Sequence, residues 1–163
     1  MNSIVERLGG QFDISFKMLA ALIDACPDSL WNEKAGGFYF WQQILHALCG
    51  SAFWLRLEGE GFAEPFSERR LFPELDGEPE GRVTKVEMRE LADAVASQAQ
   101  RFFAALPRAS LDGPSPAFAG LSRLDVIEGQ IRHLMYHVGH CDAALRDRGY
   151  ACAPWLEFGA PAS

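Results

Sequence analysis

Residues 122–148 read SRLDVIEGQIRHLMYHVGHCDAALRDR and contain three of the four histidines of the chain. Ser122 and Asp125 are typical of a helix N-terminus, because the serine hydroxyl can accept a bond from a free amide and the carboxylate supports the same turn. Two arginines near the other end suit a helix C-terminus, and Gly149 follows them. The pattern predicts one long helix.

Three further stretches have the period of an amphipathic helix, with apolar residues three and four positions apart. The first extends from Ile4 to Ala25, and the second from about Tyr39 to Leu57. The third begins at Thr84, which has the capping-box spacing with Glu87, and continues to Pro107. Together with the histidine-rich segment, the chain is expected to form four helices.

Stretches rich in proline and glycine follow the second and third helices, at residues 58–82 and 107–121. Four helices with two long connections predict an all-α four-helix bundle. Since 48% of the residues are hydrophobic, the 163 residues can bury one ordinary core, and we expect a single domain over residues 1–163. Trp155 and Phe158 predict that part of the C-terminal tail packs on the bundle.

The composition excludes several classes of protein. A net charge of -7 without a basic patch argues against a nucleic-acid partner. No apolar stretch is long enough to span a membrane and no secretory leader is recognisable, so we expect a cytoplasmic protein. The cysteines form no C-x-x-C pair, which is typical of reduced thiols in the cytoplasm. They are Cys26, Cys49, Cys141 and Cys152.

All four histidines fall on two predicted helices. His133 and His137 are four positions apart, so both rings lie on one helix face about a turn apart. His46 lies in the middle of the second predicted helix and can supply a third ligand from a facing helix. Three imidazoles predict a divalent metal site, and three protein ligands with an open position are typical of a catalytic rather than a structural site.

Two neighbouring residues allow more than one interpretation. His140 lies on the same helix stripe as His137 and could be an alternative ligand or a substrate contact, but an outer hydrogen-bonding partner or a packing residue is favoured. Cys49, three positions after His46, offers either a thiolate near the site or a buried core thiol. The histidines themselves have a structural alternative, because histidine pairs four apart also occur as hydrogen-bonded core residues.

Two further residue clusters stand out in the sequence. Aromatic residues of the second predicted helix either line an apolar pocket above the metal or fill the core. These include Trp41, Phe53 and Trp54. An acidic run in the first long connection is expected to be solvated, and no carboxylate stands at an obvious general-base position. The run is Glu74, Asp76, Glu78 and Glu80.

Two segments closely resemble the DinB-like (DinB/YfiT) metalloprotein superfamily. They are WQQILHALCGSAFWLR at residues 41–56 and RHLMYHVGH at residues 132–140. The resemblance implies a four-helix bundle in which His46, His133 and His137 bind a divalent ion. A small polar residue is common in that family near the position of His140, so the resemblance assigns this histidine no role.

The resemblance also suggests an activity, since the superfamily includes transferases and isomerases that use a low-molecular-weight thiol. We therefore expect a metal-dependent enzyme, such as a thiol-dependent S-transferase or hydrolase, that acts on a small electrophile with zinc or nickel as cofactor. The alternative is a non-catalytic metal-binding or stress-related bundle, and a homodimer is expected in either case. A shared fold does not fix the reaction.

Overall fold

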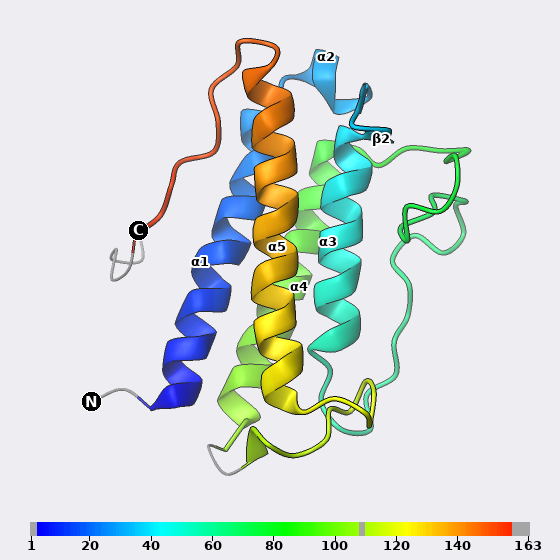
Figure 1. The fold of residues 1–163 in the computed structure, drawn as a ribbon. Coiled ribbons are helices and arrows are strands. Elements are labelled where there is room, and N and C mark those ends of the chain that lie inside the picture. Colours follow the sequence, from blue (N-terminus) through cyan, green and yellow to red (C-terminus); the bar gives the residue numbers. More distant parts are fainter. Residues whose placement is uncertain (1–2, 108–109, 158–163) are drawn as a thin grey trace.

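The computed structural model describes residues 3–107 and 110–157. Four long helices account for most of these residues (Figure 1) and span α1 Ile4–Ala25, α3 Phe40–Trp54, α4 Lys85–Ala105 and α5 Arg123–Arg146. Helices α1 and α3 each pack against both α4 and α5, so the α1/α4 side lies opposite the α3/α5 side. The predicted all-α fold is confirmed.

The helix starts follow the predicted capping signals. Thr84 caps α4 with Glu87, and Ser122 caps α5 with Asp125, each through a reciprocal capping box. A third capping box, formed by Ser3 and Glu6, begins α1. The second predicted helix was too long at its C-terminal end, because α3 ends at Trp54 rather than Leu57.

The structure adds two short elements between α1 and α3. Helix α2 covers Asp28–Trp31, and strands β1 (Lys34–Ala35) and β2 (Phe38–Tyr39) form an antiparallel hairpin. Gly36 and Gly37 form its turn with φ angles of 65° and 97°, which glycine adopts readily. Strands of two residues are too short to give an alternating pattern, and the sequence therefore did not predict them.

The core lies along the facing stripes of the long helices. In α4 the buried residues recur at helical spacing and are Met88, Ala92, Val95, Ala99 and Phe102. Helix α3 is buried around most of its circumference, including the polar side chains of Gln42, Gln43 and Ser51. Buried polar groups need hydrogen-bond partners, so these three side chains restrict how α3 can pack against the segments around it.

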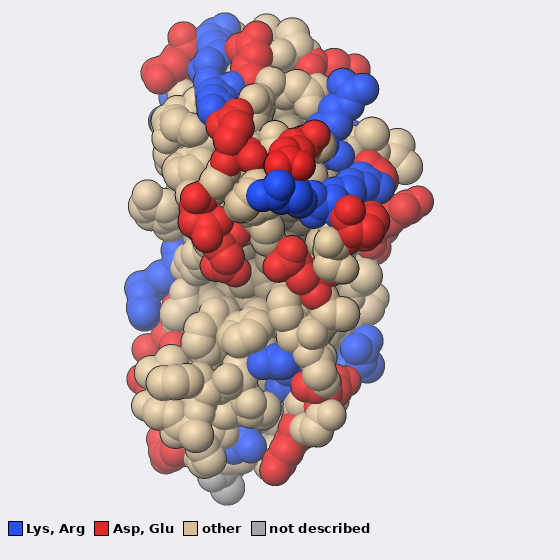
Figure 2. Space-filling view, turned by 90° about the vertical axis from the view of Figure 1, so that its right-hand side faces the viewer, with Lys and Arg blue, Asp and Glu red and all other residues tan. Residues whose placement is uncertain are grey.

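The connection from residue 55 to 84 runs alongside α3, on the side of the molecule that Figure 2 shows. The side-chain amide of Gln42 donates to the carbonyls of Leu71 and Phe72, at 3.3 and 3.1 Å. Arg69 donates to Glu87 at 2.6 Å, which fastens the connection to the start of α4. On this face acidic and basic side chains are intermixed in the upper part, and the lower part is mostly uncharged. The connection is thus held against the bundle.

The C-terminal tail runs back along the bundle beside α1 (Figure 1). Ala153 is buried and its amide donates to Asp142 at 3.1 Å, and Leu156 packs against the core. Trp155 remains 70% exposed, and Phe158 lies outside the described residues. Among the described residues, no helix has the length and apolar character needed to cross a membrane.

Candidate functional site

Helices α3 and α5 bring three histidines together. His46 comes from the middle of α3, whereas His133 and His137 lie one turn apart on α5. Each pair of imidazole centroids is 4.8 Å apart, and the candidate ligand nitrogens all lie within 4.8 Å of one another. No other group of three or more potential metal-binding side chains occurs in residues 3–107 and 110–157. The three histidines form a group that can hold a metal ion.

Oxygen atoms close to Nδ1 orient the three rings. Nδ1 of His46 lies 2.6 Å from the carbonyl oxygen of Pro73, and Nδ1 of His137 lies 2.8 Å from Oε1 of Gln43. Nδ1 of His133 lies 3.4 Å from Oε1 of Gln130. These oxygens accept hydrogen bonds, so they favour the tautomer that carries its proton on Nδ1. Nε2 of each ring is then free to bind a metal ion, as is common in protein metal sites.

Burial keeps two of the rings neutral. His137 is buried, and burial together with the neighbouring histidines lowers its pKa to about 3. Burial and His46 lower the pKa of His133 to about 4. Imidazole binds a metal in its neutral form, so both rings are in the ligand state at neutral pH. The donor set of three imidazoles fits a first-row divalent ion such as zinc or nickel.

Gly50 provides the space in which His133 approaches α3. A Cβ atom at this position would lie 2.7 Å from Cε1 and 3.1 Å from Nδ1 of the His133 ring. Such contacts are shorter than packed atoms tolerate, so a larger residue would displace the imidazole. The absence of a side chain at Gly50 is therefore part of the geometry of the site.

The two neighbouring residues singled out in the sequence lie in different surroundings. Nε2 of His140 lies 3.3 Å from the carbonyl oxygen of Ala35, so this ring packs against the hairpin and is outside the group of three. Cys49 lines a cavity together with His46 and His133. Burial, followed by the charges of Glu64 and Glu74, raises the pKa of the Cys49 thiol to about 12. A role of either residue as an outer partner of the metal ligands or as a substrate contact stays a prediction.

A cavity of about 490 Å³ opens beside the histidines. His46, Cys49 and His133 line it on one side, and its other walls include Phe53, Phe62 and Glu74. This volume is in the range of small-molecule sites. His46 and His133 are partly exposed, so a small molecule in the cavity can reach the histidine group.

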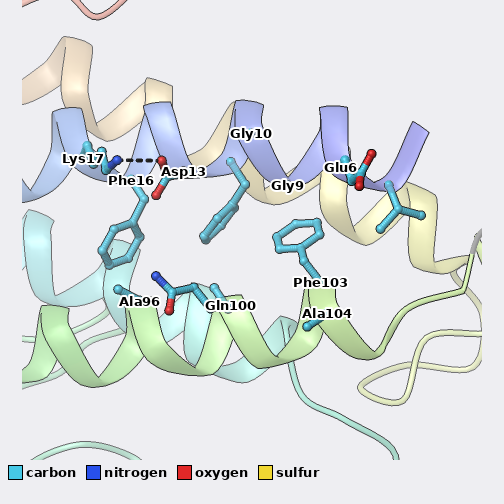
Figure 3. A pocket seen from close by; sticks show the side chains of 13 residues that line it. Glu6, Gly9, Gly10, Asp13, Phe16, Lys17, Ala96, Gln100, Phe103 and Ala104 are labelled. Carbon is cyan, nitrogen blue, oxygen red and sulfur yellow. Dashed lines mark ion pairs between the residues drawn. The ribbon is translucent and has the colours of Figure 1, made fainter. Parts of the chain in front are cut away.

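A second cavity, of about 520 Å³, lies between α1 and α4 (Figure 3), on the side of the bundle away from the histidines. Its walls include Phe12, Phe16 and Phe103, and Asp13 and Lys17 form an ion pair at its edge. None of the three clustered histidines lines this cavity. The smaller cavity beside the histidines is therefore the candidate active site.

The sequence analysis missed the residues that orient the ligands. Gln43 precedes His46 by three positions and Gln130 precedes His133 by three, so each glutamine shares a helix face with a histidine. That spacing could have identified Gln130 as a partner of His133, whereas the contact of Gln43 with His137 joins two helices and has no local signal. The contact of Pro73 with His46 depends on the path of the long connection, and no local pattern indicates it.

Comparisons with known proteins agree with the predicted resemblance. A family model described as the DinB superfamily matches residues 11–141, a range that includes all four histidines and most of every long helix. No curated protein and no solved structure matches the chain.

Proposed function

Because the chain belongs to the DinB superfamily and three of its histidines converge, we propose that it is a metal-dependent enzyme. The reaction we propose is the attack of a low-molecular-weight thiol or water on a small electrophile, as in an S-transferase or hydrolase. The observation that carries this proposal is the equal 4.8 Å spacing of the rings of His46, His133 and His137.

His46, His133 and His137 would hold the ion through Nε2, since their Nδ1 atoms face oxygen acceptors. When bound, the ion supplies Lewis acidity, which lowers the pKa of a thiol or water ligand toward neutrality. Three protein ligands leave at least one position open for such a molecule.

The residues of the chain would contribute positioning and exclusion of water. Gln43 and Pro73 fix the orientation of His137 and His46, so the ligands need little rearrangement when the ion binds. Phe53, Trp54 and Phe62 line the adjoining cavity and reduce the access of bulk water. Electrostatic interactions are stronger in such an apolar setting.

Metal analysis of the purified protein tests the proposal. We expect a first-row metal at about one equivalent in the wild type and its loss in His46→Ala and His137→Ala. His140→Ala is the matched control and should keep the metal, because His140 lies outside the group. Equal metal content in all four proteins would contradict the site.

Activity assays separate the enzyme from the non-catalytic alternative. We expect the metal-loaded protein to turn over part of a panel of thiols and small electrophiles, and His137→Ala to be inactive. A metal-loaded protein without turnover on the whole panel would support a non-catalytic metal-binding bundle. The homodimer, the cytoplasmic location and the absence of a nucleic-acid partner stay predictions.

A further inference from the structure

The cavity beside the histidines has an aromatic wall. The ring of Phe53 meets Trp54 edge to face at 5.1 Å and Phe62 edge to face at 5.3 Å, with interplanar angles of 85° and 83°. Arg56 donates to the carbonyl of Phe53 at 2.7 Å, and its guanidinium lies 4.5 Å from the centre of that ring. These contacts give the wall a defined shape, which suits a flat apolar group.

Phe62 belongs to the 55–84 connection, whereas Phe53 and Trp54 end α3. The wall is therefore assembled from two segments, and the ring of Phe62 also lies 5.9 Å from the Arg56 guanidinium. Arg56 itself does not line the cavity. Its guanidinium forms cation–π contacts with Phe53 and Phe62.

The protein side chains that line the cavity carry negative charge. Glu74 lines it, and among the described lining residues there is no lysine or arginine. Glu74 is exposed, lines the same cavity as His46, and directly follows Pro73, whose carbonyl oxygen contacts that histidine. Burial first, and then the charges of Glu64 and Glu74, raise the pKa of the Cys49 thiol.

We propose that this cavity is the substrate subsite of the metal centre, and that it selects small molecules with a flat apolar group and a neutral or positive charge. The proposal rests on the metal-dependent function above, and it names Glu74 as the residue that determines specificity. A carboxylate beside an aromatic wall favours a flat group that carries an ammonium, through packing on the wall and charge pairing with Glu74. A carboxylate on the ring of a metal-bound substrate faces repulsion from Glu74, and no lysine or arginine among the described lining residues is there to pair with it.

A set of three matched probes tests the charge preference. The probes are benzohydroxamates with a methyl, an aminomethyl or a carboxylate group in the para position, since the hydroxamate binds zinc and the ring reaches the aromatic wall. Their dissociation constants are measured by calorimetry on the zinc-loaded full chain at low salt, where charge effects are least screened. We expect the aminomethyl probe to bind about three- to tenfold more tightly than the carboxylate probe.

Three variants test which residues are responsible for the charge preference and for the affinity. Glu74→Gln should reduce the ratio between the aminomethyl and carboxylate probes to about one, while the methyl probe keeps its affinity. Glu58→Gln removes an exposed carboxylate of the same connection that does not line the cavity, and should leave the ratio unchanged. Phe62→Ala should weaken all three probes by a similar factor.

The outcomes distinguish this inference from the function on which it rests. Equal affinities of the three probes, or a ratio that survives in Glu74→Gln, would overturn the charge preference while zinc-dependent binding of the methyl probe still supported the metal centre. If no probe binds in a zinc-dependent manner, both proposals fail. Metal analysis of each variant verifies that zinc occupancy is unchanged.

Discussion

Oε1 of Gln43 lies 2.8 Å from Nδ1 of His137, although the two residues are 94 positions apart in the chain. Both side chains are buried, at 2% and 3% exposure, so neither can replace this hydrogen bond with water. The contact joins α3 to α5 at the candidate metal site. It fixes both the tautomer and the rotation of the most deeply buried of the three clustered histidines.

Replacing Gln43 by alanine should therefore weaken metal binding without removing a ligand. We expect the affinity for zinc to fall about 10- to 100-fold, the range seen when outer partners of metal ligands are removed. The measurement is competition against a chelator of known affinity. Gln43→Glu keeps an oxygen acceptor and should retain most of the affinity.

Gln98→Ala is the matched control for this variant. Gln98 donates to the carbonyls of Ala52 and Leu55 at the end of α3, away from the histidine group. Its loss should cost about 1–3 kcal/mol of stability with little change in zinc affinity. If Gln43→Ala and Gln98→Ala had equal zinc affinities, the orienting role of Gln43 would be refuted.

Two helix glycines should respond in opposite ways to alanine. At Gly50 the new methyl group would collide with the His133 ring, so we expect Gly50→Ala to lower zinc affinity by at least about tenfold. A methyl group at Gly139 would meet no atom of another segment within 4 Å, so Gly139→Ala should stabilise α5 by about 1 kcal/mol. Zinc titration and thermal unfolding of both variants measure the two effects. A Gly50→Ala variant that binds zinc as tightly as the wild type would contradict the collision with His133.

Local patterns predicted the helices and the grouping of three histidines. The capping signals at Thr84 and Ser122 located the N-termini of two helices, because such signals depend only on neighbours a few positions away. The four-residue spacing of His133 and His137 is also a local pattern, and it correctly predicted that both rings lie on one helix face. His46 was expected in this group because it is the one histidine outside the histidine-rich segment and lies in the middle of an amphipathic helix, and the structure places it beside the other two.

Features that depend on the path of the chain were not predictable. The acidic run was expected to be solvated, and its four residues are indeed exposed, but no pattern indicated that Glu74 also lines the cavity. His140 shares the stripe of His137, but its ring packs against a hairpin that no periodicity indicated. In both cases a long-range contact determines the surroundings, and the sequence period carries no information about it.

Acid should destabilise the metal-free protein in a window set by the buried histidines. Burial lowers the pKa of His133 to about 4 and that of His137 to about 3, below the ordinary value of 6.5. Below pH 6.5 the unfolded chain therefore binds protons that the folded protein does not, so the free energy of unfolding falls as the pH drops from about 6.5 toward 4.

Urea unfolding of the metal-free protein at several pH values across this window measures the effect. Carboxylates also contribute to acid destabilisation, so the comparison is with His137→Gln, which lacks one of the two buried groups. We expect the loss of stability between pH 7 and pH 5 to be smaller in the variant, by on the order of 1 kcal/mol. Identical losses in the two proteins would show that His137 does not contribute.

Removal of the metal should leave the fold intact. The core extends over all four long helices, and most of its buried side chains lie away from the histidine group, so the helical circular dichroism of a chelator-treated sample should match that of the loaded protein. A ligand at 100 times its dissociation constant adds about 2.7 kcal/mol, which corresponds to a fall in Tm of roughly 5–10 °C on its removal. Collapse of the helical signal would instead indicate a structural metal and favour the non-catalytic alternative. A Tm unchanged by the chelator, in a sample verified to have carried metal at His46, His133 and His137, would mean that the ion gives the native state no net stabilisation.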